Sequence, residues 1–327
     1  MDKKAICLGE LLIDFVSTVN GVTLRDAPGF EKAPGGAPAN VAVGLSKLGI
    51  ETYFTGKIGK DAFGDFLRMT LEKFGVNTTY LTASTRAKTT LAFVSLTEEG
   101  ERDFVFYRDP GADMLLDQSD ITDQMFLGSG VFHFGSITMT HEPASSATFK
   151  AIHLARKYGY LVSFDPNLRP ALWKNLDEAR EKMRHGLELT DIVKMNQEEA
   201  IFIADANTVD EAIHFIQKSY DLALIAITMG KEGSLVLHKD KSLRVEGFPV
   251  HSIDTTGAGD GFVAGLISSL YMFWNDLRER KAIPIDTLRH AGRRANAVGA
   301  LTTLKKGAIP ALPTQEEVEI FIEGNPL

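Results

Sequence analysis

A glycine-rich stretch, DTTGAGDGF at residues 254–262, places a carboxylate beside backbone amides. Gly257, Ala258 and Gly259 precede a long apolar segment, and such small residues let successive N–H groups point into one cavity. If a helix begins here, its unpaired amides would hold a phosphoryl group. Asp260 would then be kept ionised by the helix field and would take a proton from an attacking hydroxyl. A helix cap with a plain turn is the alternative.

A second glycine stretch, APGGAPANVAVGLSKLG, opens another expected helix, for which Gly49 is a natural stop. Gly35 and Gly36 allow a small ligand to approach the backbone closely. Asn40, near the helix start, would either hydrogen-bond to a polyol or cap the helix, and the local sequence does not separate these roles.

Other nucleotide and metal motifs do not occur in the sequence. There is no Walker-type GxxxxGK[ST] loop, no complete GxGxxG and no zinc helix, and the eight histidines are dispersed. An NAD-dependent oxidoreductase needs a glycine fingerprint after its first strand, which LGELLIDF does not supply. The single cysteine, Cys7, lies in an apolar stretch and is expected to be a buried thiol in a reducing compartment.

The charge and hydropathy of the chain argue against nucleic-acid and membrane partners. The formal net charge is −8 and the pI is about 5.6, so the surface should repel phosphodiester backbones. Lys305 and Lys306, beside Gly307, suit either a phosphate contact or a solvated turn. The apolar segment 261–274 is shorter than the roughly 20 residues of a bilayer span. The N-terminal residues lack the apolar core of a secretion signal, and we expect a cytoplasmic protein.

Short apolar runs alternate with helix-like segments along most of the chain. This pattern predicts an α/β fold with a doubly wound, mainly parallel sheet covered on both faces. We expect a single domain over residues 1–327. The segments at about 15–34 and 88–112 break the rhythm and predict a small antiparallel β-sheet that acts as a lid, with a turn at residues 98–101.

Seven motifs occur in an order that resembles the ribokinase-like carbohydrate kinase family, and the set is closest to its fructokinase members. The resemblance runs nearly end to end. The motifs are GELLIDF, APGGAPANVAVGLSKLG, GKIGKDAFG, FYRDPGADMLL, FDPNLR, DTTGAGD and KKGAIPALP.

The resemblance implies a doubly wound sheet with a β lid over a sugar, and transfer of the γ-phosphoryl group of ATP to a sugar hydroxyl. Asp260 matches the family's catalytic base, and residues 257–259 match its anion hole. The residues that match the family's sugar pocket are Asp14, Gly35, Gly36 and Asn40. Arg108 and Arg169 match basic residues near the substrate, although either could form a surface ion pair instead.

Further matches concern the nucleotide and the ions. Asn196 and Glu199 match an N-x-x-E pattern that orders the Mg²⁺ shell, with Mg²⁺ expected chiefly through ATP and water. The nucleotide side matches Thr228, Gly230 and Asn296, although the segment TMGKEG also reads as a hairpin turn. Asp254 and Thr256, with the backbone near Gly307, resemble a monovalent-cation site, which makes K⁺ activation an expectation.

The resemblance favours an ATP-dependent kinase that phosphorylates the O6 hydroxyl of D-fructose, with Asp260 as the general base. The stretch FYRDPGADMLL favours fructose, while the same scaffold also serves ribose, 2-keto-3-deoxygluconate and nucleosides. A non-catalytic sugar-binding regulator is the alternative from another class. The open edges of the lid strands predict a homodimer that pairs the two lids.

Overall fold

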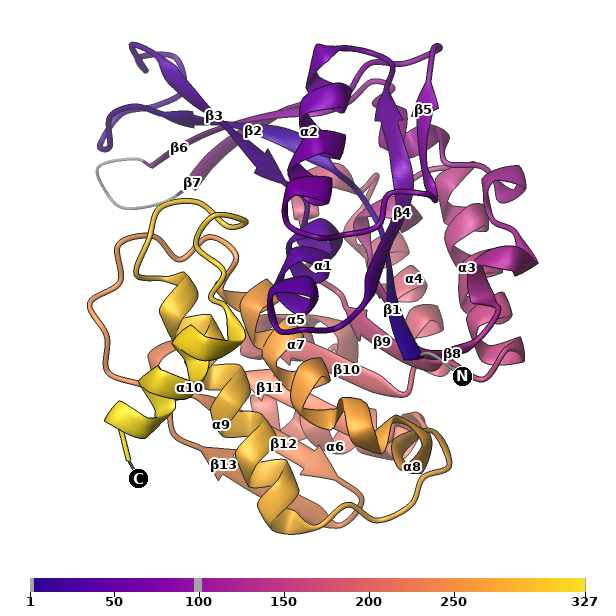
Figure 1. Ribbon diagram of the computed structural model, residues 1–327, viewed down its shortest axis with the longest axis vertical. Coiled ribbons are helices and arrows are strands. Elements are labelled where there is room, and N and C mark those ends of the chain that lie inside the picture. The colour runs from indigo at the N-terminus through magenta and orange to yellow at the C-terminus, as the bar shows by residue number, and fades with distance from the viewer. Residues whose placement is uncertain (1–2, 97–101, 327) are drawn as a thin grey trace.

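Two β-sheets of unequal size organise the chain in the computed structural model, which describes residues 3–96 and 102–326 (Figure 1). Over these residues the larger sheet has nine strands, in the spatial order β13-β12-β11-β10-β9-β8-β1-β4-β5. They are β1 (Lys3–Leu8), β4 (Thr52–Gly59), β5 (Leu81–Ser84), β8 (Ser129–Gly135), β9 (Leu161–Asp165), β10 (Ile192–Asn196), β11 (Leu224–Thr228), β12 (Ser234–His238) and β13 (Lys241–Val245). All neighbours pair in parallel except β11-β12 and β12-β13.

Helices cover both faces of this sheet (Figure 1). One face is covered by α1 (Ala37–Lys47), α2 (Ala62–Lys73), α7 (Ala258–Leu270), α8 (Trp274–Arg278), α9 (Ile285–Thr302) and α10 (Gln315–Gly324). The other face is covered by α3 (Ala144–Lys157), α4 (Leu176–Glu188), α5 (Gln197–Ala204) and α6 (Val209–Ser219).

The sequence of β1 shows why both faces must be covered. Ala5 and Cys7 belong to the apolar core on the α1 and α7 side, whereas Ile6 and Leu8 belong to the core on the α3 side. Side chains alternate across a strand, so a continuous apolar strand supplies both cores. The predicted doubly wound sheet is confirmed, and Cys7 is a buried free thiol.

Residues 261–270 of the apolar segment 261–274 lie in α7, which begins at Ala258 and packs against α1 and α9. Because α7 starts at the glycine turn, its N-terminus forms part of the candidate active site described below. None of the helices in the described residues has both the length and the apolar character needed to cross a membrane.

The smaller sheet lies at the upper left of Figure 1 and contains β2 (Leu12–Ser17), β3 (Phe30–Gly35), β6 (Leu91–Leu96) and β7 (Arg102–Tyr107), in the order β3-β2-β6-β7. The expectation of a purely antiparallel sheet is wrong, because β2 and β6 pair in parallel. A long connection through β3, α1, β4, α2 and β5 joins β2 to β6, and such a crossover permits parallel pairing. The predicted turn at residues 98–101 lies outside the described residues.

Two extended stretches of the sequence are interrupted in the structure. The apolar run at residues 5–16 is not one strand, because the chain leaves the large sheet after Leu8 and enters the small sheet at Leu12. The extended segment before the glycine turn ends as a strand at Val245, so a loop separates β13 from α7. This loop contains Asp254 and Thr256, whose hydrogen bonds are described below.

Candidate active site

Helix α7 begins at the glycine turn as predicted. Gly257 is its N-cap residue and has a left-handed backbone with φ 80°, a conformation that glycine adopts at little cost. A Cβ atom added at Gly257 would lie 2.7 Å from the Cβ of Ala308, so a side chain does not fit without movement. The N-cap residue provides no side chain to cap the helix. The amides of the first turn are therefore suited to an anion.

Asp260 lies in the first turn of α7 and is only 8% exposed. Its Oδ2 atom accepts a hydrogen bond of 2.7 Å from Nδ2 of Asn40, in the first turn of α1. The packing of α1 against α7 makes this contact possible. The two glycine stretches that the sequence analysis singled out therefore meet at one site, although they are far apart in the sequence.

Burial raises the pKa of Asp260 to about 6, against the hydrogen bond from Asn40. Asp165 adds to the rise, while the positive charges of Lys194 and Arg169 oppose it. Burial works against the ionised form that the helix field was expected to favour, because it removes the carboxylate from water. Above about pH 6 the carboxylate is still mostly ionised and able to accept a proton.

Lys194, on β10, is a residue of this site that the sequence analysis missed. Its Nζ atom lies 3.0 Å from Oδ2 of Asp165, on the neighbouring strand β9, and both side chains are buried. A Cβ atom at Gly259 would lie 3.0 Å from the same Nζ, so the ammonium group lies against the glycine turn. Burial opposes its charge, yet the nearby carboxylates raise the pKa of Lys194. A lysine inside the apolar run DIVKMN was the available signal.

The predicted sugar-side residues cluster where β3 ends and α1 begins. A Cβ atom at Gly35 would lie 2.1 Å from Oδ2 of Asp14, so only glycine allows this approach. Gly36 has φ 116°, and a Cβ atom there would meet the Glu10 carbonyl oxygen at 2.3 Å. Asp14 pairs across the small sheet with Ala33. The structure therefore places Asp14, Gly35, Gly36 and Asn40 along one short path to Asp260.

Arg108 lies in a buried network, so the alternative of a surface ion pair is wrong for it. Its Nε atom donates to Oδ2 of Asp113 at 2.7 Å. The other guanidinium nitrogens donate to the Thr140 hydroxyl at 3.1 Å and to the Ile137 carbonyl at 3.3 Å. A guanidinium has five N–H donors, so these contacts leave capacity for a substrate oxygen. Binding by Arg108 stays a prediction.

Arg169 follows β9 and is partly buried. Its Nη1 atom donates to the Leu168 carbonyl at 3.1 Å, and its charge is felt at Asp260. The structure thus places Arg169 in the electrostatic neighbourhood of the glycine turn. The salt bridges within the described residues do not include Arg169.

Asn196 and Glu199 form the start of α5 as a reciprocal cap. Oδ1 of Asn196 accepts from the Glu199 amide at 2.7 Å, and Oε2 of Glu199 accepts from the Asn196 amide at 2.8 Å. The other oxygen of Glu199 accepts from the Leu168 amide at 3.0 Å. Burial raises the pKa of Glu199, while Lys194 opposes the rise. A carboxylate so engaged fits a water-mediated Mg²⁺ contact better than direct ligation.

The predicted nucleotide-side residues lie toward the antiparallel edge of the large sheet. Thr228 ends β11, and Gly230 has φ 58° in the turn that leads to β12. The hairpin interpretation of TMGKEG is confirmed, because β11 and β12 pair in antiparallel fashion. Asn296, on α9, donates to the carbonyls of Val245 and Glu246 at 3.1 and 3.0 Å. That contact fixes the end of β13, and nucleotide binding by these three residues stays a prediction.

The predicted monovalent-cation residues are joined by hydrogen bonds. Oδ1 of Asp254 accepts from the amide and the hydroxyl of Thr256 at 2.9 and 2.6 Å. Oδ2 of Asp254 accepts from the Gly307 amide at 2.9 Å. The loop before α7 and the segment at Gly307, both parts of the predicted site, are therefore in contact. Over the described residues, clusters of three or more His, Cys, Asp or Glu able to hold a metal are absent.

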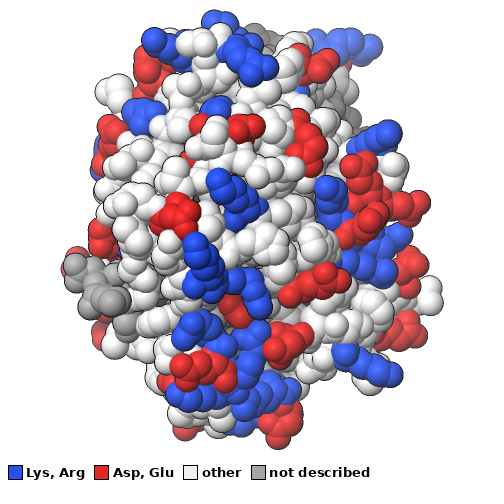
Figure 2. Space-filling view, turned by 90° about the vertical axis from the view of Figure 1, so that its right-hand side faces the viewer, with Lys and Arg blue, Asp and Glu red and all other residues white. Residues whose placement is uncertain are grey.

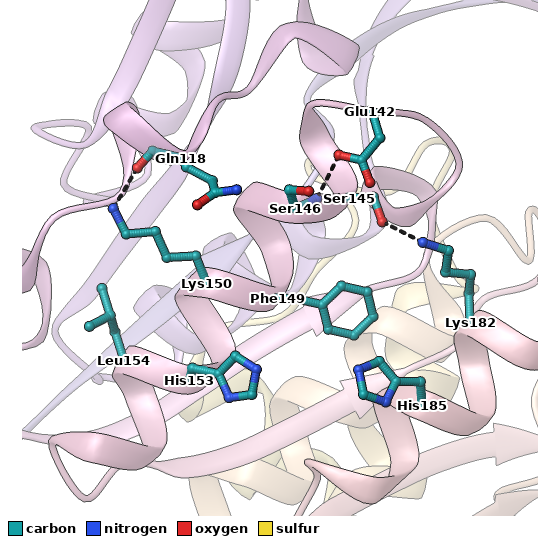
Figure 3. A pocket seen from close by; sticks show the side chains of 10 residues that line it. All are labelled: Gln118, Glu142, Ser145, Ser146, Phe149, Lys150, His153, Leu154, Lys182 and His185. Atoms are coloured by element: carbon teal, nitrogen blue, oxygen red, sulfur yellow. Dashed lines mark hydrogen bonds between the residues drawn. The ribbon is translucent and has the colours of Figure 1, made fainter.

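A surface groove of about 580 Å³ lies between α3 and α4 (Figure 3). The Phe149 ring lies 4.6 Å from that of His185, and Lys150 and Lys182 lie on either side. None of the predicted site residues lines this groove, so it is not the site built around Asp260. Figure 2 shows positive and negative side chains intermingled on the face that it presents.

Comparisons with known proteins agree with this geometry. Residues 2–315 match the description "pfkB family carbohydrate kinase". A probable chloroplastic fructokinase-6 of Arabidopsis thaliana is 46% identical over 96% of this chain and 80% of its own. A Vibrio cholerae fructokinase solved with fructose, ADP and calcium ion is 33% identical, with a TM-score of 0.87 and 98% of each chain covered. An ATP-bound Xylella fastidiosa fructokinase is also 33% identical, with a TM-score of 0.89 and 99% of each chain covered.

The family match spans nearly the whole chain, and both solved structures share its fold over almost their full length. The predicted resemblance is confirmed. This chain belongs to the pfkB family of carbohydrate kinases.

Proposed function

We propose that Asp260 is the general base of fructose phosphorylation and that the start of α7 holds the phosphoryl group. The protein is an ATP-dependent sugar kinase that phosphorylates fructose, since its relatives and structural neighbours are fructokinases. The observation that supports the residue roles is the position of Asp260, buried in the first turn of a helix that begins at an uncapped glycine turn.

In this reaction the O6 oxygen of fructose attacks the γ-phosphorus of ATP. The bond between the γ-phosphorus and the bridging oxygen breaks, ADP leaves, and the hydroxyl proton passes to Asp260. Amides at residues 257–259 stabilise the charge that spreads over the transferring group. Lys194, held by Asp165, adds a positive charge beside Gly259. Arg169 contributes a second positive charge near Asp260.

Substrates are held on two sides of Asp260. Asp14, Gly35, Gly36, Asn40 and Arg108 bind the sugar, because carboxylate, amide and guanidinium groups suit paired hydroxyls. On the other side the nucleotide contacts Asn196, Thr228, Gly230 and Asn296. Glu199 orders Mg²⁺ through water, and Mg²⁺ would supply charge neutralisation of the phosphates.

A monovalent cation, K⁺, is proposed at Asp254 and Thr256. A double mutant of the Vibrio cholerae fructokinase, solved with fructose, ADP and potassium ion bound, supports this choice. The contact between Asp254 and the Gly307 amide brings two loops together beside α7, where a cation would stiffen the turn. Activity measured in K⁺ against Na⁺ at equal ionic strength tests this, and equal rates would contradict it.

A homodimer that pairs the small sheets is also proposed. The ring centroid of Phe93 lies 5.0 Å from that of Phe15 and 5.4 Å from that of Tyr107. These three rings form an aromatic surface on one face of the small sheet. On that face Val105 is 44% and Tyr107 is 65% exposed. Because side chains alternate along β2, Asp14 points to the opposite face from Phe15. Sedimentation as a monomer at micromolar concentration would contradict the dimer.

We also propose a cytoplasmic, reducing location, which the buried free thiol of Cys7 supports.

The experiment that tests the proposal is a panel of phosphoryl acceptors assayed with ATP and Mg²⁺. Fructose, ribose, glucose, 2-keto-3-deoxygluconate, fructose 6-phosphate and adenosine are compared in the wild-type enzyme and in Asp260→Asn. We expect fructose to be the best acceptor and kcat to fall by roughly three orders of magnitude or more in the variant. Preference for another acceptor would overturn the sugar, and full activity of Asp260→Asn would overturn the base.

A further inference from the structure

We infer that Asn40 is a positioning residue for the proton acceptor: its amide holds one oxygen of Asp260 and leaves the other to the substrate hydroxyl. This inference rests on the proposed role of Asp260 as the base. It gives Asn40 a task in the chemical step in addition to its proposed place in the sugar pocket. The carboxylate would otherwise be able to rotate, and only one of its oxygens can take the proton in a given pose.

The geometry around the two side chains is specific. Nδ2 of Asn40 lies 2.7 Å from Oδ2 of Asp260, and the residues are 5% and 8% exposed. Only the amide nitrogen can donate here, since a carbonyl oxygen turned toward the carboxylate would repel it. Oδ1 of Asn40 is buried and has no hydrogen-bond partner in the part of the chain that the structure describes. A buried acceptor without a partner is costly unless a ligand fills it. A sugar hydroxyl would satisfy Oδ1 of Asn40.

The first turn of α1 is fixed from outside the helix, which holds Asn40 in place. The Ala37 amide donates to Oε1 of Glu10 at 2.8 Å, so a carboxylate from beyond the end of β1 caps this helix. A Cβ atom at Gly9 would lie 2.2 Å from Cγ of Pro38, which shows how closely the strand end approaches the helix start. Asn40 is therefore carried on a constrained turn rather than on a loop.

The charged groups that face Asp260 come from three other segments. Asp165 on β9 disfavours its ionised form, whereas Lys194 on β10 and Arg169 after β9 favour it. Lys194 is itself paired with Asp165 at 3.0 Å. Asn40 is the neutral donor of this group and opposes the effect of burial. Removing its donor should therefore raise the pKa of Asp260 and make the base harder to ionise.

The test is the pH dependence of fructose phosphorylation by the wild-type enzyme, Asn40→Ala and Asn40→Asp. We expect the acid limb of kcat/KM to move up by about one pH unit in Asn40→Ala, which lacks the donor. In Asn40→Asp we expect a larger upward shift, because a like charge replaces the donor in the same shape. If circular dichroism shows that one variant is unfolded, the other decides the question.

Two control variants separate the explanations. Asp14→Asn removes a proposed sugar contact without touching Asp260, so it should raise KM while its acid limb stays at the wild-type position. An acid limb that is equally unmoved in the folded Asn40 variants would overturn the inference and leave Asn40 as a sugar ligand alone. Activity retained by Asp260→Asn is a different result, because it would remove the base and with it the proposed function. The ionisation of ATP is common to all variants and cancels in the comparison.

Discussion

Helices α1 and α7 both begin at a glycine with positive φ, yet their N-termini are used differently. At α1 the N-cap is Gly36, with φ 116°, and the Glu10 carboxylate accepts from the first helical amide. At α7 the N-cap is Gly257, with φ 80°, and a carboxylate of the first turn, Asp260, is turned toward α1 instead. One N-terminus is therefore filled by an acid of the same chain, whereas the other can receive a phosphoryl group.

Most other helices of the described residues are capped more simply. In α2, α4, α5, α6 and α10 the N-cap side chain itself accepts an amide hydrogen of the first turn. A side-chain cap is local and stabilises the helix by about 1 kcal/mol. A glycine at the same position leaves the amides to a tertiary partner or a ligand, and α1 and α7 are the helix starts near Asp260 that have this feature.

The largest effect should come from Gly257→Ala, which would close the turn at α7. The new methyl group would meet Ala308 at 2.7 Å, on a backbone with positive φ, so the amides of residues 258 and 259 would be displaced. Because these amides stabilise the charge of the transferring group, we expect kcat to fall by about 100-fold or more. Steady-state kinetics with fructose and ATP measures this.

A matched control is Gly49→Ala at the other end of α1. Gly49 has φ 84°, and a methyl group there meets only the side-chain oxygen of Gln315, at 3.3 Å. It carries the same backbone strain, about 1 kcal/mol, without touching the site. If Gly257→Ala lost no more activity than Gly49→Ala, the start of α7 would not be the phosphoryl site and the contrast with α1 would disappear.

The sequence predicted both helix starts but not the contact between them. The local spacing of residues indicates a glycine turn followed by an apolar helix at both places. It therefore allowed the prediction of Gly36, Asn40, Gly257 and Asp260 as site residues. The parallel sheet was predicted for a similar reason, since continuous apolar runs need cover on both faces. The contact between Asn40 and Asp260 depends on how α1 packs on α7, which no local pattern contains.

Side-chain contacts that depend on which strands are neighbours also could not be predicted from the sequence. Lys194 and Asp165 meet because β10 lies beside β9, and each residue alone looks like an isolated charge at a strand. Glu10 lies in a motif of the resemblance, but its task as the cap of α1 requires the chain to turn out of the large sheet after Leu8. The same turn divided the run at residues 5–16 between two sheets.

A moderate effect is expected when the cap of α1 is removed. Glu10→Leu leaves the Ala37 amide without its acceptor, whereas Glu10→Gln keeps a carbonyl oxygen for it. We expect Glu10→Leu to be about 2 kcal/mol less stable than Glu10→Gln in urea unfolding at neutral pH, and to have the lower kcat because Asn40 is then less well held. Equal stabilities would mean that the Glu10 carboxylate does not cap α1.

An effect on stability alone is expected from the charge of Glu10 itself. Burial raises its pKa from 4.5 to about 7, so within this interval the folded protein binds more protons than the unfolded chain. The contribution of Glu10 to stability is therefore complete below pH 4.5 and is lost as the pH rises to about 7. Glu10→Gln does not titrate, so its stability relative to wild type should increase over this interval, by up to about 3 kcal/mol at pH 7. Asp260 titrates equally in both proteins and cancels. A difference that stays flat with pH would show that solvent reaches Glu10, and α1 would then resemble α7 in having an open N-terminus.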